Sequence, residues 1–185
     1  MQSTELFERA RRDQHRALGL QQALRGLLDT ARQSGLELVP FKGVVDSQAL
    51  YGDPGVRACG DLDLLASRAQ LSAAQELLAR LGYRECGTFA ALSPRAQRWW
   101  LRVDHSIPYQ LESRDLFVDL HFRMNDLPLV ALDHDGWQSE LEDTTFLGVP
   151  CRRLNATARY LSLLTHAQRS LWTSLRGYCG LVRAR

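Results

Sequence analysis

Acidic and apolar residues alternate over one short segment, Asp61-Leu62-Asp63-Leu64-Leu65. Alternate side chains of a β-strand lie on the same face of the sheet, so this segment predicts a strand with both carboxylates on one face and leucines on the other. Paired anions repel and raise each other's pKa unless a cation lies between them. The pair therefore indicates a metal ion or a basic partner, and a solvent-exposed strand face is the alternative interpretation.

A second segment, residues 117–121, alternates in the same manner and places Asp119 and His121 on one face. If this strand lies beside the first, Asp119 joins Asp61 and Asp63 at one point. Three carboxylates arranged in this way hold metal ions that bind a triphosphate and activate an attacking hydroxyl. Mg²⁺ suits such a site, with Mn²⁺ as the alternative, because Mg²⁺ takes one or two carboxylates together with substrate phosphates.

Basic residues upstream of the acid pair are candidates for phosphate contacts. Lys42, the only lysine of the chain, and Gly43 stand where a predicted strand turns into a helix. Backbone N–H groups and an ammonium favour phosphate binding there, and an ordinary solvated lysine is the alternative. Arg57 precedes the acid pair and either neutralises a triphosphate or pairs with a neighbouring carboxylate. His105 and His121 are accessory candidates, although a histidine near a strand is more often a hydrogen-bonded structural residue.

Hydrophobic periodicity and turn residues predict a chain of mixed helices and strands. We expect a helical N-terminal arm over 1–35, a core over 36–153 and a C-terminal helical segment over 154–185. Within these ranges the pattern predicts strands at 36–41, 61–65, 106–111, 116–122 and near 146–152, and helices at 44–51, from a Ser67 cap to Leu81, from Ser93-Pro94, and after an Asn155 cap. The polar turn 112–115 predicts that two of these strands form a hairpin.

The composition is that of an ordinary folded domain, with 45% hydrophobic and 24% charged residues. No apolar run reaches the roughly 18 residues of a membrane span, and no signal-peptide core or C-x-x-C pair is present. We therefore expect a cytoplasmic protein with reduced thiols and no membrane partner. The net charge of +2 does not indicate a nucleic-acid partner. Residues 151–185 carry seven arginines and no acid, which favours a solvated or partner-facing helical surface over a phosphate-binding one.

Five short segments and their order carry a resemblance to a known family. They are Phe41-Lys42-Gly43, Tyr51-Gly-Asp-Pro-Gly-Val-Arg57, Gly60-Asp-Leu-Asp-Leu-Leu65, Leu81-Gly-Tyr83 and Val118-Asp-Leu-His121. Together they resemble a nucleotidyltransferase family of largely unassigned substrate, within the DNA polymerase β-like superfamily. The resemblance implies an α+β fold with a polymerase β-like core, in which a small mixed or antiparallel sheet is flanked by helices. Family members commonly run beyond this length, so a further helical region is expected after this chain.

The same resemblance implies roles for individual residues. Asp61 and Asp63 would bind the metal ions, and Asp119 would be the third ligand and help deprotonate the acceptor. Lys42-Gly43 would take the place of the Gly-Ser phosphate loop of the superfamily, and lysine in place of glycine is a departure from it.

The leading hypothesis is an enzyme that moves a nucleoside monophosphate from an NTP to a hydroxyl on a small molecule, a protein or RNA. A D-x-D glycosyltransferase that uses a nucleotide sugar and Mn²⁺ is a weaker hypothesis, because about 60 residues before the acid pair are too few for the nucleotide-binding half of such folds. A non-catalytic nucleotide-binding or antitoxin-like regulatory module is the alternative from another class. The sequence leaves the acceptor, the base preference and the oligomeric state open.

Overall fold

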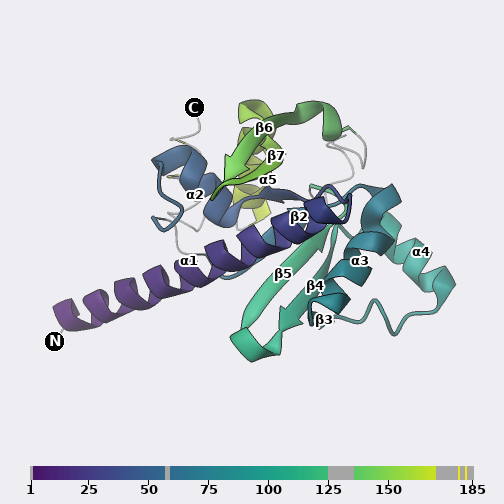
Figure 1. The fold of residues 1–185 in the computed structure, drawn as a ribbon, viewed down its shortest axis with the longest axis horizontal. Helices are drawn as coiled ribbons and strands as arrows, with labels where there is room; N and C mark the ends of the chain where they lie inside the picture. Colours follow the sequence, from purple (N-terminus) through teal and green to yellow (C-terminus); the bar gives the residue numbers. More distant parts are fainter. Residues whose placement is uncertain (1, 57–58, 125–135, 170–178, 180–181, 183–185) are drawn as a thin grey trace.

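Five strands form one mixed sheet at the centre of the molecule (Figure 1). Their order is β1 (Val39–Phe41), β2 (Leu62–Leu65), β5 (Leu116–His121), β4 (Ser106–Leu111) and β3 (Arg84–Glu85). Strands β2 and β5 run parallel, and the other three neighbouring pairs run antiparallel. This arrangement of strands and flanking helices confirms the predicted α+β class with a small mixed sheet.

The computed structural model describes residues 2–56, 59–124, 136–169, 179 and 182. Among them, no helix is long and apolar enough to cross a membrane. Most of the predicted C-terminal helical segment beyond residue 169 lies outside the described residues. Arg57 also lies outside them.

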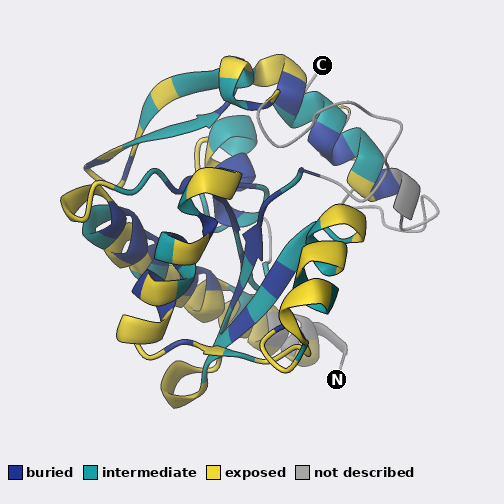
Figure 2. Cartoon of the chain, turned by 90° about the vertical axis from the view of Figure 1, so that its right-hand side faces the viewer, coloured by how far each residue is buried: buried dark blue, intermediate teal, exposed yellow. Residues whose placement is uncertain are grey.

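Two helices cover the leucine face of the sheet. Helix α1 (Gln2–Gln33) crosses this face diagonally and its N-terminal part projects beyond the sheet (Figure 1). Its apolar stripe begins at Ala17 and packs with α3 (Leu71–Arg80) against the two inward leucines of β2 in one core cluster. Burial of apolar surface contributes roughly 25 cal/mol per Å², so this cluster stabilises the packing of both helices on the sheet. Figure 2 shows the buried residues concentrated in the strands and on the inner sides of the helices.

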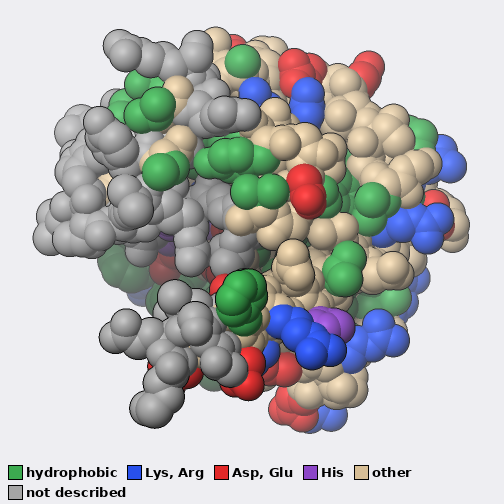
Figure 3. Space-filling model, turned by 90° about the vertical axis from the view of Figure 1, so that its left-hand side faces the viewer, with side chains coloured by type: hydrophobic (Ala, Val, Ile, Leu, Met, Phe, Trp, Pro, Cys, Tyr) green, Lys and Arg blue, Asp and Glu red, His purple; other side chains and the backbone are tan. Residues whose placement is uncertain are grey.

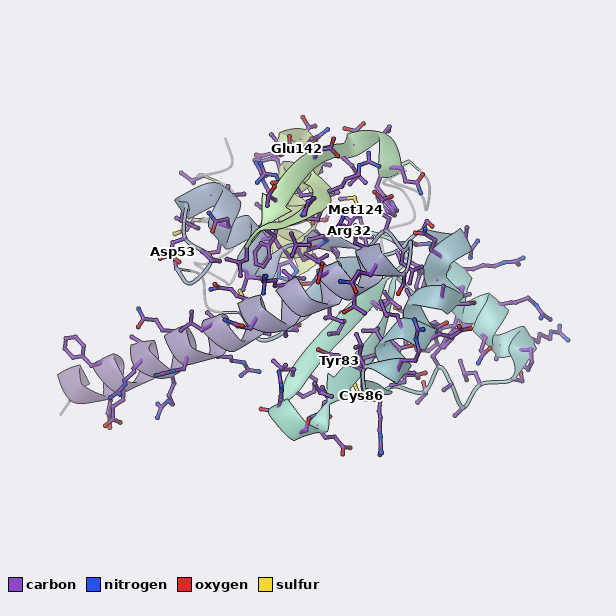
Figure 4. All side chains as sticks on the ribbon, in the orientation of Figure 1. Arg32, Asp53, Tyr83, Cys86, Met124 and Glu142 are labelled. Atoms are coloured by element: carbon purple, nitrogen blue, oxygen red, sulfur yellow. The ribbon has the colours of Figure 1, made fainter. Side chains whose placement is uncertain are left out.

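A hairpin lies beside β1 at the edge of the sheet, and the helix that follows it packs on the opposite face. The hairpin is β6 (Leu141–Phe146) with β7 (Val149–Leu154), and it leads into α5 (Ala156–Arg169). Trp137 is 1% exposed and forms a second core cluster with residues of β1, β2, β7 and α5 and with Met124, which Figure 4 labels beside this hairpin. The strand predicted near 146–152 is confirmed in part by β7, but Phe146 ends β6, a strand that was not predicted. The segment reverses direction between β6 and β7, at a Leu-Gly turn in which both residues have positive φ.

Local turn chemistry decides the remaining elements. Helix α2 (Gly43–Tyr51) follows β1 directly, and α4 (Pro94–Val103) begins at the predicted cap, where the Ser93 hydroxyl accepts from the backbone of the first turn. The predicted Ser67 cap is wrong, because a 3₁₀ turn (Arg68–Gln70) comes before α3 and the Ser67 side chain makes no capping hydrogen bond. The two-residue strand β3 was not predicted, since so short a segment shows no alternation.

The predicted hairpin of β4 and β5 is confirmed, with Leu111 paired to Leu116 across a turn that includes the 3₁₀ segment Glu112–Arg114. Asp115 closes this turn with φ 48°, a left-handed conformation that aspartate tolerates better than most residues. The cap of α5 is also confirmed, because Asn155 Oδ1 accepts a hydrogen bond of 2.9 Å from the backbone of Ala158.

Candidate active site

The acidic face of the sheet is organised by the parallel pairing of β2 with β5. In this register Asp63 lies directly opposite Asp119, and Phe41 of β1 lies opposite Asp63 on the other side. Residues paired in this way point to the same face, so the two carboxylates lie side by side. The leucines that alternate with them face the core under α1 and α3.

Three potential metal ligands converge here. One ligand atom from each of Asp63, Asp119 and His121 lies within 4.8 Å of the other two. His121 Nε2 is 2.8 Å from Asp63 Oδ1, and the histidine is 1% exposed. Asp61, one residue before β2, is outside this group of three, but its charge raises the pKa of Asp119 and therefore acts at the same place.

Lys42 reaches into the same cluster from the turn between β1 and α2. Its Nζ is 3.4 Å from Asp63 Oδ1 and lies 4.6 Å from the centre of the Phe41 ring. The backbone of Lys42 has φ 57° and ψ −161°, a region that is essentially reserved for glycine. Gly43 follows with φ 48°, and its α-carbon faces the backbone oxygen of Asp61. The turn is therefore built against the start of β2.

The electrostatics divide the carboxylates into two kinds. Burial, followed by the charges of Asp63 and Asp61, raises the pKa of Asp119 to about 6. Burial and the charge of Asp63 also raise the pKa of Asp61. Burial acts in the same direction on Asp63, but the hydrogen bond from His121 and the charge of Lys42 outweigh it and lower the pKa of Asp63 to about 2. Asp63 is thus an anion at all working pH values, whereas Asp119 titrates near neutrality.

His121 is neutral at pH 7. Burial lowers its pKa to about 4, against the hydrogen bond with Asp63, which favours the charged form. Because the ionised Asp63 carboxylate only accepts, Nε2 of His121 carries the proton and donates it. The imidazole is fixed between the rings of Phe41, at 4.8 Å between centroids, and His105, at 5.3 Å. His121 therefore orients one carboxylate oxygen, and His105 lies behind it.

A family model covers nearly the whole chain. Residues 2–184 match the family described as uncharacterised nucleotidyltransferase. The chain belongs to this family. The resemblance inferred from the five segments is thereby confirmed, and with it the assignment of the chain as a nucleotidyltransferase. A search of curated proteins gave no match.

Solved nucleotidyltransferases share the fold. The solution structure of the antibiotic-resistance factor ANT(2'')-Ia is 14% identical with a TM-score of 0.63, covering 90% of this chain and 83% of that chain. The crystal structure of ANT(2'')-Ia with adenylyl-2''-tobramycin is 15% identical with a TM-score of 0.64, covering 89% and 86%. An antigenic nucleotidyltransferase-like protein from Paracoccidioides brasiliensis is 12% identical with a TM-score of 0.51, covering 89% and 74%.

One basic residue near the acids was missed by the sequence reasoning. Arg16 of α1 donates from its guanidinium to the carbonyl of Gly60 at 3.0 Å, directly before Asp61, and its charge lowers the pKa of that carboxyl. The two residues are 44 positions apart, and nothing in the local pattern of α1 distinguishes Arg16 from its neighbouring arginines. The acidic cluster therefore also receives a cation from the N-terminal arm.

Basic and acidic side chains both occur on the face drawn in Figure 3, and several basic ones lie close together around a histidine at its lower right. Apolar side chains lie among the charged ones on this face.

Proposed function

We propose that this nucleotidyltransferase uses Mg²⁺, or Mn²⁺ in its place, to move a nucleoside monophosphate from an NTP to a hydroxyl acceptor. The observation that carries the proposal is the pairing of Asp63 with Asp119 across β2 and β5, with Lys42 at the adjoining helix start. Family membership supports the reaction class, and the acid cluster supports the metal dependence.

The donor set fits a hard divalent cation. We propose Asp61, Asp63 and Asp119 as its ligands, because carboxylate oxygens are what Mg²⁺ and Mn²⁺ prefer. The raised pKa values of Asp61 and Asp119 support this, since mutual repulsion contributes to both and a bound cation would relieve it. His121 acts as an orienting neighbour in this proposal, because its protonated nitrogen already faces Asp63. When bound, the metal ions would neutralise the triphosphate and the charge that develops on it.

Asp119 is the proposed general base. The acceptor oxygen attacks the α-phosphorus, a new O–P bond forms, and the bond to the β-phosphate oxygen breaks so that pyrophosphate leaves. The acceptor proton passes to Asp119 during this step. In the metal-free protein its pKa is about 6, and a bound metal ion would keep this carboxylate ionised at pH 7, in the form that can accept a proton. Asp63, with its much lower pKa, remains a permanent anion beside it.

Phosphate contacts are proposed for Lys42, Gly43 and Arg57. The first intrahelical hydrogen bonds of α2 run to the carbonyl of Lys42, from the amides of Val45 and Asp46. The amides before them are at the positive end of the helix, where phosphate binds favourably. Arg57 follows from its place just before the acid pair in the sequence.

The acceptor is a hydroxyl of a small molecule, a protein or RNA. A small molecule is the first class to test, because the similar fold of ANT(2'')-Ia has been solved with adenylyl-2''-tobramycin. We also keep a non-catalytic nucleotide-binding module as the alternative function, since acids can hold metal and nucleotide without turnover.

Transfer can be measured with NTPs radiolabelled at the α-phosphate, Mg²⁺ or Mn²⁺, and panels of small-molecule, protein and RNA acceptors. We expect metal-dependent label transfer with release of pyrophosphate, and a loss of at least about 100-fold in Asp63→Asn and Asp119→Asn. Asp115→Asn, at the other end of β5, is the matched control and should keep the activity. Undiminished transfer by Asp119→Asn contradicts the proposed mechanism, and tight metal-dependent binding without transfer to any acceptor favours the non-catalytic module.

A further inference from the structure

One oxygen of Asp63 has two donors. His121 Nε2 lies 2.8 Å from Asp63 Oδ1, and Lys42 Nζ lies 3.4 Å from the same atom. Both side chains are well shielded, with 16% of the lysine side chain and 2% of the histidine side chain exposed. The ammonium of Lys42 places a positive charge beside this oxygen, in a position that is largely closed to solvent.

The backbone directs Lys42 to this place. The Lys42 backbone has φ 57° and ψ −161°, a conformation that L-residues rarely adopt. Such conformations persist where the surrounding structure enforces them. The chain has one lysine, and it stands here. An ammonium is a compact point charge on a flexible stem, so it can exchange one anionic partner for another more readily than a planar guanidinium.

We propose that Lys42 is a displaceable internal counter-ion, which occupies the cation position at Asp63 until a nucleotide triphosphate draws the ammonium onto phosphate. This inference rests on the proposed function and adds that metal binding and nucleotide binding are coupled. One ammonium cannot balance Asp63 and a triphosphate at the same time. Divalent metal and nucleotide therefore bind cooperatively, because each favours the position of Lys42 that admits the other, and this coupling is reciprocal.

In the protein without nucleotide, the position of Lys42 weakens metal binding. While Lys42 balances Asp63, a divalent cation must displace it or share the carboxylate with it, so metal alone binds weakly. Removal of the ammonium should therefore open the metal position before any nucleotide is present.

The test measures Mn²⁺ binding to the full chain by electron paramagnetic resonance of free Mn²⁺, without nucleotide and with a non-hydrolysable α,β-methylene ATP, after subtraction of the Mn²⁺ that the analogue binds in the absence of protein. In the unmodified protein we expect Mn²⁺ affinity to rise at least about 10-fold when the nucleotide analogue is present. Lys42→Met should bind Mn²⁺ at least about 10-fold more tightly than the unmodified protein without nucleotide, and its coupling to nucleotide should fall to less than about threefold.

Matched variants separate direct occupancy from general electrostatics. Arg16→Met also removes a positive charge near Asp61, but the Arg16 guanidinium bonds to the carbonyl of Gly60, so this variant should change Mn²⁺ affinity by less than about threefold. Lys42→Gly suits the local backbone and repeats the test if the methionine variant is poorly folded. Mn²⁺ affinity that is unchanged or weaker in both Lys42 variants overturns the proposal, as does an equal gain in Arg16→Met.

The same Mn²⁺ measurements distinguish failure of the proposed function from failure of the counter-ion proposal. If neither the unmodified protein nor the Lys42 variants bind Mn²⁺, and Asp63→Asn behaves like them, both the metal site and the counter-ion are wrong. If the unmodified protein binds Mn²⁺ with nucleotide and transfers label, but the Lys42 variants gain no metal affinity, the counter-ion alone is wrong.

Discussion

At the scale of single residues, Lys42 combines an unfavourable backbone with a charge that the acids need. A non-glycine residue in this region costs about 1–3 kcal/mol. Lys42→Gly and Lys42→Met both lose the ion pair with Asp63, so the difference between them isolates the backbone strain. We expect the glycine variant to be more stable by about 1 kcal/mol, after the roughly 0.5–1 kcal/mol that glycine loses through its freedom in the unfolded chain.

Urea denaturation of the two Lys42 variants at one pH measures this difference. A methionine variant that is as stable as the glycine variant, or more stable, would show that the turn is unstrained. The strain would then be no part of how the site is built.

Asp119 offers a second prediction at this scale, for the metal-free protein. Its pKa rises from 3.8 in the unfolded chain to about 6 in the folded protein, so the folded state binds the proton more tightly. Stability from this group is therefore present below pH 3.8 and is lost as pH rises through about 6. Asp119→Asn removes that loss and should stabilise the metal-free protein by roughly 1–3 kcal/mol at pH 8.

The advantage of Asp119→Asn should shrink as the pH falls through 6 and disappear near 3.8, which denaturant titrations at several pH values can follow. Asp115→Asn is the control, because Asp115 lies at the other end of the same strand. An advantage of Asp119→Asn that stays constant with pH would mean that burial of the charge is not its cause.

At the scale of elements, Asn155 joins the β6–β7 hairpin to α5. Its Oδ1 accepts from the first turn of α5, and its Nδ2 donates to Glu140 at 2.9 Å. Loss of an N-cap of this kind costs about 0.5–2 kcal/mol. We expect Asn155→Ala to lower the melting temperature by about 2–4 °C for each kcal/mol lost, and Asn155→Asp, which keeps the cap oxygen, to lower it less. Equal losses in the two variants would assign the effect to the contact with Glu140.

Elements encoded by local patterns could be predicted from the sequence. The β4–β5 hairpin follows from two alternating strands around a polar turn, and the Ser93 and Asn155 caps follow from side chains that bond within their own helix turn. The sequence pattern predicts a strand through the turn between β6 and β7. Leu147 adopts φ 45° there, and no residue-level preference of leucine signals that conformation.

Long-range contacts of the site were less accessible. The sequence placed Asp63 and Asp119 on strands with a common acidic face, but their direct pairing depends on a parallel register that no local pattern encodes. The orientation of Asp63 by His121 and the contact of Arg16 with Gly60 join segments 58 and 44 residues apart. Such contacts arise from the packing of whole elements, so composition and periodicity do not predict them.

At the scale of the whole molecule, the sheet brings its acids together on one face, with its leucines buried under α1 and α3 on the other. The unfavourable part of this arrangement is concentrated in a few groups: two carboxyls with raised pKa and a strained lysine. Groups of this kind cluster at functional sites, where a ligand relieves them. The central claim is therefore that a divalent metal and a nucleotide complete the site.

Isothermal titration of α,β-methylene ATP into the full chain, with and without Mg²⁺, tests this claim most directly. The account predicts binding that requires Mg²⁺, is lost in Asp63→Asn and Asp119→Asn, and is retained in Asp115→Asn. Nucleotide binding of equal strength without Mg²⁺, or undiminished in Asp119→Asn, would contradict it.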